Sequence, residues 1–201
     1  MSGVVLGQAA RCVGAVTAAV MLLCPTGSAQ PKARASRACP YQNSSVSRTP
    51  SGDLRAAVVC LINRNRERWH LPPVHAQAEI EQAAQGHTGQ MVAINALTHD
   101  GVGGSDPGTR LSEAGYRWAA FGEVLASGYP TPRRAVDAWL ASSEHCPIML
   151  SPLYRSVGVG VVPGAVRGVA NVPGTWTADF GLREGRRPPS GNWGPAGGCP
   201  H

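Results

Sequence analysis

Residues 137–150 read DAWLASSEHCPIML, and the rest of the chain can be organised around this stretch. Its first part places Trp139 on an apolar face at helical spacing. Its second part, where that pattern stops, holds Glu144, His145 and Cys146. Because binding side chains are often carried by the turns that follow rigid elements, we predict that His145 borders a cleft.

Two upstream pairs supply the other ionisable side chains that this cleft needs, Thr98-His99 and Gly122-Glu123. We interpret His99, Glu123 and His145 as lining one site. His87 lies on the inner stripe of a helix expected over about residues 76–96. A lone histidine in that position is usually a hydrogen-bonded core residue, so we interpret it as core rather than as a ligand.

The composition is that of a globular protein with one domain and appendages. The chain has 201 residues, of which 43% are hydrophobic and 15% are charged. Its net charge of +6 favours anionic partners such as cell-wall polymers or lipid headgroups. The arginines are spread along the chain without an aromatic-interleaved basic run, so we expect no nucleic-acid binding.

Residues 1–29 have the pattern of a signal peptide. Arg11 precedes an apolar run over residues 13–23, and Gly27-Ser28-Ala29 offers a small-residue cleavage site. The run is shorter than the about 20 apolar residues of a membrane span. An uncleaved anchor and cleavage further downstream stay open as alternatives. We therefore expect a protein that is secreted or held in the cell envelope, with no stable membrane span after cleavage.

Export changes the interpretation of the cysteines, because an oxidising compartment favours disulfides. Four cysteines follow the predicted signal peptide: Cys39, Cys60, Cys146 and Cys199. They allow three pairings, and no CxxC zinc pattern is present. We favour Cys39–Cys60, which would join an N-terminal arm to a helix, and Cys146–Cys199, which would pin the C-terminal tail near the cleft.

Periodicity and turn residues predict the order of the elements. We expect a flexible arm over residues 30–50, one domain over 51–182 and a Gly/Pro-rich tail over 183–201. Within the domain we predict helices over 51–68, 76–96, 107–114 and from residue 132, and strands over 157–162, 166–172 and 175–180. Two of these strands could form a hairpin around Pro163-Gly164 or Pro173-Gly174. On the first helix, we expect Arg64, Arg66 and Arg68 to face water.

Several stretches between about residues 54 and 181 form a recognisable series. They are Leu61 to Arg66, Ala83-Ala84 to His87 and Met91, Thr98-His99, Arg110-Leu111 to Tyr116, Gly122-Glu123, Ala138-Trp139, Glu144-His145 with Ile148 to Leu150, and Val157 to Gly160. In their order and spacing, these stretches resemble the CAP superfamily of cysteine-rich secretory proteins, antigen 5 and pathogenesis-related 1 proteins, and its bacterial secreted branch in particular.

The resemblance implies an α+β fold, an α-β-α sandwich with a small antiparallel sheet between helical layers. It also implies a cleft with two histidines and two acids, in which His99 and His145 match the histidines and Glu123 matches the first acid. The sequence departs from the family at Val124, which replaces an asparagine, and near Ser142, where the second acid would fall. Glu144 is a candidate substitute for that acid.

Two neutral imidazoles, from His99 and His145, could hold Zn²⁺ or another divalent cation. A protein zinc site uses at least three protein ligands, so Glu123 would have to point inward to complete one. The alternative is that His99–Glu123 and His145–Glu144 are hydrogen-bonded pairs that orient loops. A metal cofactor is therefore an open expectation.

Family resemblance favours a non-enzymatic binding module that acts as a monomer on a lipid, a peptide or a cell-wall polymer. The alternatives are a metal-assisted hydrolase using His99, Glu123 and His145, and a purely structural secreted protein. The sequence has no Gly-x-Ser-x-Gly elbow and no HExxH helix. A lipid ligand would need an apolar groove, for which Trp118, Phe121 and Trp139 are the candidates. Trp139 fits the hydrophobic core better than a groove, because it lies on the same helix face as Val136 and Leu140.

Overall fold

The computed structural model describes residues 38–188 and residue 199, so the predicted signal peptide lies outside the described residues. The elements follow one another as α1 (Ser51–Arg68), β1 (His75–Ala76), α2 (Ala78–Ile94), the 3-10 helix η1 (Val102–Gly104), α3 (Pro107–Glu113), β2 (Trp118–Ser127), α4 (Pro132–Leu140), α5 (His145–Met149), β3 (Ser156–Val162) and β4 (Thr175–Arg183).

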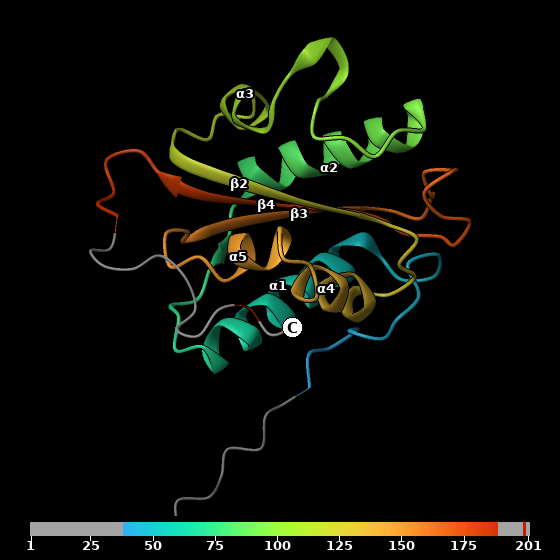
Figure 1. Ribbon diagram of the computed structural model, residues 1–201, viewed down its shortest axis with the longest axis horizontal. Helices are drawn as coiled ribbons and strands as arrows, with labels where there is room; N and C mark the ends of the chain where they lie inside the picture. The colour runs from blue at the N-terminus through green and yellow to red at the C-terminus, as the bar shows by residue number, and fades with distance from the viewer. Residues whose placement is uncertain (1–37, 189–198, 200–201) are drawn as a thin grey trace, which may run out of the picture. The chain divides into compact units, whose positions relative to one another are not determined.

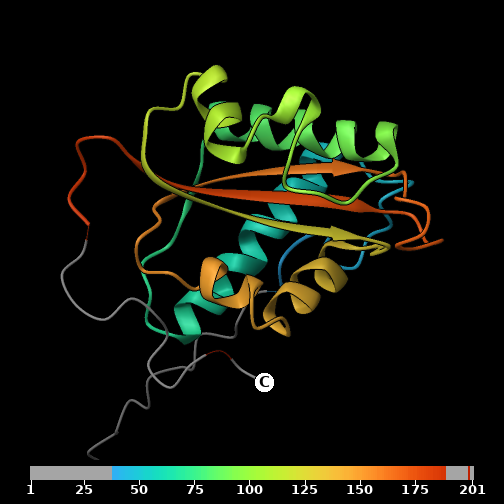
Figure 2. The ribbon, with the colours of Figure 1, turned by 45° about the horizontal axis from the view of Figure 1, so that its top comes forward.

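The four strands form one sheet in the order β1-β3-β4-β2. β4 pairs antiparallel with both β2 and β3, while the short β1 runs parallel to β3. Helices α2 and α3 lie on one face of the sheet, and α1, α4 and α5 lie on the other (Figure 1, Figure 2). The predicted α-β-α sandwich is thereby confirmed.

The main hydrophobic core lies between the sheet and the layer of α1, α4 and α5. It includes the fully buried Val58 and Ile62 of α1, Trp139 of α4, and Trp176 and Phe180 of β4. Each such aliphatic or aromatic side chain stabilises the fold by about 1.5–3 kcal/mol relative to its exposed state. The indole of Trp139 donates to the carbonyl of Leu125 at 2.9 Å, so its one polar group is satisfied inside the core.

Strand β3 packs closely against α2 because it alternates valine with glycine. Val157 and Val159 point into the main core, while Gly158 and Gly160 face the helix on the other side. A Cβ at either glycine would collide with the backbone of α2. The glycines of this Gly-x-Gly run therefore allow a helix to approach the sheet, which sets the position of α2 behind the site described below.

We expected Arg66 to face water, but the structure buries it. Its guanidinium is fully buried and donates to the carbonyls of Pro72, Met149, Ser151 and Tyr154 at 2.8–3.2 Å. Burial lowers its pKa to about 10. The prediction was wrong because helical periodicity shows which face a residue occupies but not what later packs over that face.

The strand predicted over residues 166–172 was also wrong, because this segment is a loop with turns between β3 and β4. Gly168 adopts a left-handed conformation with φ of 90°. Val169 and Val172 are exposed, and only Val166 is buried. The valines are therefore not arranged as one face of a strand. The hairpin itself forms, with β3 and β4 as its arms.

Conversely, residues 118–127, for which we predicted no regular structure, form the ten-residue strand β2. The helix predicted from residue 132 is present, and the hydroxyl of its N-cap Thr131 accepts from the backbone N–H of Arg134 at 3.3 Å. Helix α2 begins at Ala78 and ends at Ile94, within the expected range.

The described part of the chain contains two disulfides, and they are the pairing that we favoured. Cys39–Cys60 joins the segment before α1 to that helix, and Cys146–Cys199 joins α5 to the C-terminal tail. Within the part of the expected arm that the structure describes, residues 38–50 form turns, and Val46 is buried with its N–H donating to the carbonyl of Pro130 at 2.9 Å.

Candidate functional site

Glu123 is the centre of the site, and strand geometry decides which way it points. Alternate residues of β2 face opposite sides of the sheet. Val124 is therefore buried in the main core, while Glu123 faces the layer of α2 and α3. The valine that replaces the family's asparagine thus packs in the core, away from the site. Gly122 is also on the core side, where a Cβ would lie 2.7 Å from the hydroxyl of Tyr154.

Both carboxylate oxygens of Glu123 are occupied. Oε1 lies 2.7 Å from Nδ1 of His99, and Oε2 lies 2.7 Å from Nη2 of Arg110. Nη1 of the same arginine donates to the carbonyls of His99 and Ser105 at 2.9 and 2.7 Å. Arg110 therefore holds both the carboxylate and the loop that carries His99, which orients the imidazole from two directions.

The cationic groups of Arg110 and His99 favour the charged form of Glu123, and the carboxylate of Glu123 favours the charged form of His99. Burial by itself raises the pKa of Glu123, but the hydrogen bond from His99 and the charge of Arg110 outweigh it, so the pKa is lowered overall. The hydrogen bond to Glu123 raises the pKa of His99. Because the His99 side chain is 56% exposed, solvent screens part of this attraction. The carboxylate is thus ionised at neutral pH and is held mainly by its buried arginine.

His87 closes the cluster from α2 and is a core histidine, as its position predicted. Its Nε2 lies 2.8 Å from the carbonyl of Thr98 and 3.9 Å from Oε2 of Glu123. Burial lowers its pKa, although the nearby carboxylate partly offsets this effect. A neutral His87 with its proton on Nε2 donates to Thr98 and fixes the chain one residue before His99.

Asp179 is a second buried acid at this site, and sequence reasoning missed it. It lies on β4 directly opposite Glu123 in the register of β2 and β4. The residue is 1% exposed, and no N–H or O–H group of the described residues donates to either of its oxygens. Burial and the adjacent charge of Glu123 raise its pKa well above the ordinary value, as expected for two carboxyl groups in one site. We interpret Asp179 as the protonated member of the pair.

His145 begins α5 and lines a separate pocket of about 270 Å³. The hydroxyl of Ser142 accepts from the backbone N–H groups of Glu144 and His145 at 3.3 Å, which shapes the turn before the helix. Burial lowers the pKa of His145 and outweighs the opposing charge of Glu144, and the charge of His99 adds a smaller lowering, so the imidazole of His145 is neutral at pH 7.

The lining of this pocket combines His145 with mostly apolar side chains. They are Leu97, Leu125, Ala126, Ser127, Tyr129, Ala138, Trp139, Ser142 and Val169. Trp118 and Phe121 do not line this pocket. Their rings pack edge to face beside α3, with 4.7 Å between the ring centroids. The three aromatic residues that we expected to border one groove thus divide between two places.

Glu144 is exposed, and its carboxylate forms no hydrogen bond with His145 among the residues that the structure describes. The structure therefore brings His99 to Glu123 and leaves Glu144 at the surface. No group of three His, Cys, Asp or Glu side chains is arranged for a metal ion within residues 38–188 and 199. With both oxygens of Glu123 engaged, the two imidazoles are fewer donors than a stable zinc site uses.

The sequence contained a signal for each residue that was missed. Arg110 starts a stretch shared with the CAP family, yet an arginine in a short helix is usually a surface residue. Asp179 is the only charged residue within the run Thr175 to Phe180, where the other side chains are apolar or small and polar. An acid in the middle of a buried strand needs a partner or a proton. That partner, Glu123, is set by strand pairing and is not visible from the sequence.

Known proteins share this arrangement of elements. An extracellular protein with an SCP domain from Bacillus anthracis superposes with a TM-score of 0.58 at 22% identity, over 67% of this chain and 44% of that chain. An outer surface protein from Borrelia burgdorferi superposes with a TM-score of 0.56 at 20% identity, over 63% of this chain and 90% of that chain. At these identities, the superpositions show the fold alone.

In sequence, the chain is 29% identical over 105 residues to protein YkwD of Bacillus subtilis (strain 168), which covers 52% of this chain and 41% of that protein. The chain thus spans less than half the length of this relative and of the Bacillus anthracis protein. No helix within the described residues is long and apolar enough to cross a membrane. Because residues 59–180 match the family model and the fold agrees with it, the chain belongs to the cysteine-rich secretory protein (CAP) family.

Proposed function

We propose that this protein is a non-enzymatic extracellular binding module whose ligand enters the pocket beside His145. The proposal rests on the contacts of Glu123, because each of its two carboxylate oxygens is already bound, one to His99 and the other to Arg110. A carboxylate held in this way is a poor general base, because it must lose a strong interaction to accept a proton. The cluster therefore serves to position the loop of His99.

The pocket itself suits a ligand with an apolar segment and one polar group. Leu97, Leu125 and Trp139 offer apolar surface, and the neutral His145 can donate or accept one hydrogen bond. A volume of about 270 Å³ accommodates part of a larger ligand, such as an acyl chain or an apolar peptide side chain. Of the ligand classes expected from the sequence, this chemistry favours a lipid or a peptide.

An extracellular location agrees with several independent features. The superposed bacterial proteins are extracellular or surface proteins by name, and this chain carries two disulfides. The signal-peptide pattern of residues 1–29 supports export in the same way.

The proposal is tested by filling the pocket. Ala138→Leu adds three carbon atoms to its wall, whereas Ala56→Leu adds the same atoms to an exposed position of α1. Calorimetric titration with decanoate and with a leucine-containing tripeptide should show saturable binding of one probe to the wild type. We expect Ala138→Leu to weaken that binding at least about tenfold, since overfilling a packed site costs about 1–3 kcal/mol.

Unchanged binding in Ala138→Leu, or equal weakening in Ala56→Leu, would place the ligand elsewhere. Catalysis is examined with a 4-nitrophenyl ester of decanoic acid and the Glu123→Gln variant. Turnover by the wild type that is lost in this variant would contradict a non-enzymatic role and restore the hydrolase alternative.

A further inference from the structure

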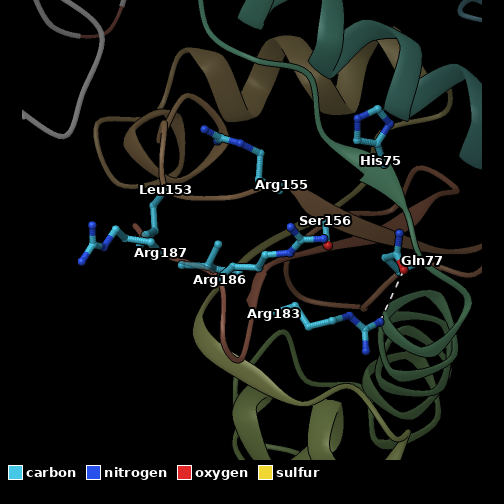
Figure 3. Close-up of a pocket in the computed structure, with 9 residues that line it drawn as sticks. His75, Gln77, Leu153, Arg155, Ser156, Arg183, Arg186 and Arg187 are labelled. Carbon is cyan, nitrogen blue, oxygen red and sulfur yellow. Dashed lines mark hydrogen bonds between the residues drawn. The ribbon is translucent and has the colours of Figure 1, made fainter. Parts of the chain in front are cut away.

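A second pocket, larger than the one beside His145, has four arginines among the nine residues that line it. It has a volume of about 630 Å³ and lies where β1, the start of β3 and the end of β4 meet. Arg155, Arg183, Arg186 and Arg187 line it together with His75 and Gln77 (Figure 3). We propose that this pocket binds a linear polyanion, a chain that carries phosphate groups at intervals along its length.

Most of the positive charge in this pocket is not balanced by carboxylates. Nη2 of Arg183 lies 3.2 Å from Oε1 of Glu79, and its guanidinium also stacks over the ring of Tyr116 at 4.6 Å. Arg155 donates through Nη1 to the main-chain carbonyls of Pro152 and Tyr154, which carry no net charge. Arg183 is thus a compensated member of the group, and Arg155 is not.

The remaining two arginines have no acidic partner among the residues that the structure describes, because no ion pair involves Arg186 or Arg187. The nearest acid in the sequence, Glu184, is paired with Arg117 at 2.7 Å. Residues 185–201 contain no Asp or Glu. These residues therefore bring no acidic side chain that could neutralise the pocket, and an external anion can do so.

The arrangement of the guanidinium groups favours an extended ligand over a single phosphate. In Figure 3 the side chain of Arg187 extends away from the other arginines, whereas Arg183 reaches toward Gln77 on the opposite side. A site for one phosphate would direct its donors to one point. Donors spread around an open pocket instead match anionic groups that are spaced along a chain.

The surroundings of the pocket also distinguish a polymer from a membrane. A membrane-binding surface presents apolar side chains beside its basic residues. The large apolar residues exposed on the described part of the chain are Tyr41, Ile94, Val102, Val169 and Val172, and none of them lines this pocket. The two leucines of its lining are Leu153, which is half-buried, and Leu182, which is buried. A concave basic site with so little exposed apolar surface fits a flexible polyanion that can enter it.

The test uses short-chain inorganic polyphosphate and the protein with both disulfides formed. Arg186→Gln/Arg187→Gln removes two charges from the pocket, and Arg48→Gln/Arg134→Gln removes two exposed charges from outside it. By calorimetry, we expect polyphosphate to bind the wild type and the control alike and to bind the pocket variant about tenfold more weakly. The salt dependence of binding should also be smaller in the pocket variant.

Both double variants should melt at the wild-type temperature, because the substituted arginines make no side-chain hydrogen bond with the described residues that would be lost on substitution. Equal weakening in the two variants would show binding to the overall charge and would overturn the proposal. So would orthophosphate binding as tightly as polyphosphate, or binding of phosphatidylglycerol vesicles without binding of polyphosphate.

Discussion

Glu123 and Asp179 lie directly opposite each other on β2 and β4, and both are buried. The two acids differ in their surroundings, because Glu123 is bound by His99 and Arg110 while Asp179 receives no hydrogen-bond donor from the described residues. Their pKa values consequently move apart, downward for Glu123 and upward for Asp179. The site thus holds one buried negative charge, which its arginine can balance.

The protonation of Asp179 predicts how stability depends on pH. A carboxyl group whose folded pKa is raised stabilises the fold fully below its ordinary pKa of 3.8, and this contribution is lost as the pH rises through the folded pKa. Asp179→Asn cannot ionise. The free energy of unfolding of this variant, minus that of the wild type, should therefore increase as the pH rises above about 4 in urea denaturation. A difference that stays constant with pH would mean that Asp179 is ionised in the folded protein.

The pairing of Arg110 with Glu123 predicts a large effect of removing the arginine. Arg110→Gln leaves a buried carboxylate with only a half-exposed histidine, which should lower the free energy of unfolding by about 3–5 kcal/mol. Arg117→Gln breaks an exposed ion pair with Glu184 and should cost less than about 1 kcal/mol. Urea denaturation measures both values. Adding Glu123→Gln to Arg110→Gln should recover part of the loss, and a purely additive double variant would contradict the pairing.

Arg66 predicts a second stability effect, which comes from hydrogen bonds to main-chain carbonyls. Arg66→Met leaves four carbonyls without their donor, of which those of Met149 and Tyr154 are buried, so we expect the free energy of unfolding to fall by at least about 3 kcal/mol. Arg68→Met on the exposed side of α1 should change it by no more than about 0.5 kcal/mol. Hydrogen exchange should accelerate in residues 149–154 of the Arg66 variant. Equal losses in the two variants would show that the carbonyl contacts do not stabilise the fold.

The three site histidines should titrate differently in nuclear magnetic resonance. We expect a pKa above the ordinary 6.5 for His99, because of its bond to Glu123, and values below it for His87 and His145. The contribution of His99 to stability is fully present below pH 6.5 and is lost as the pH rises through its folded pKa. In Glu123→Gln the pKa of His99 should fall. A His99 that titrates below His145 in the wild type would contradict the geometry.

Elements with strong local signals could be predicted from the sequence. Helix α1 has the predicted bounds because its apolar face repeats at helical spacing, and α4 begins at its Thr-Pro signal. Strand β2 was not predicted. Helices lie on both sides of the sheet, and the last five residues of the strand, 123–127, are all buried, so they show no simple alternation of apolar and polar side chains. Residues 166–172 show the opposite case. Their valines predicted a strand, but Gly168 has a positive φ and the segment forms a loop with turns.

The sequence by itself determined the family, the four disulfide cysteines and the main helices. It also singled out His99 and Glu123, which the structure places in contact. These depend on residue type, order and local spacing, which the chain shows directly. Only the tertiary structure decided that Asp179 faces Glu123, that Arg110 binds that carboxylate, and that Arg66 is buried. Strand register and helix packing bring together residues that are far apart in the chain. Charge balance and pKa in a buried site depend on those neighbours rather than on local sequence.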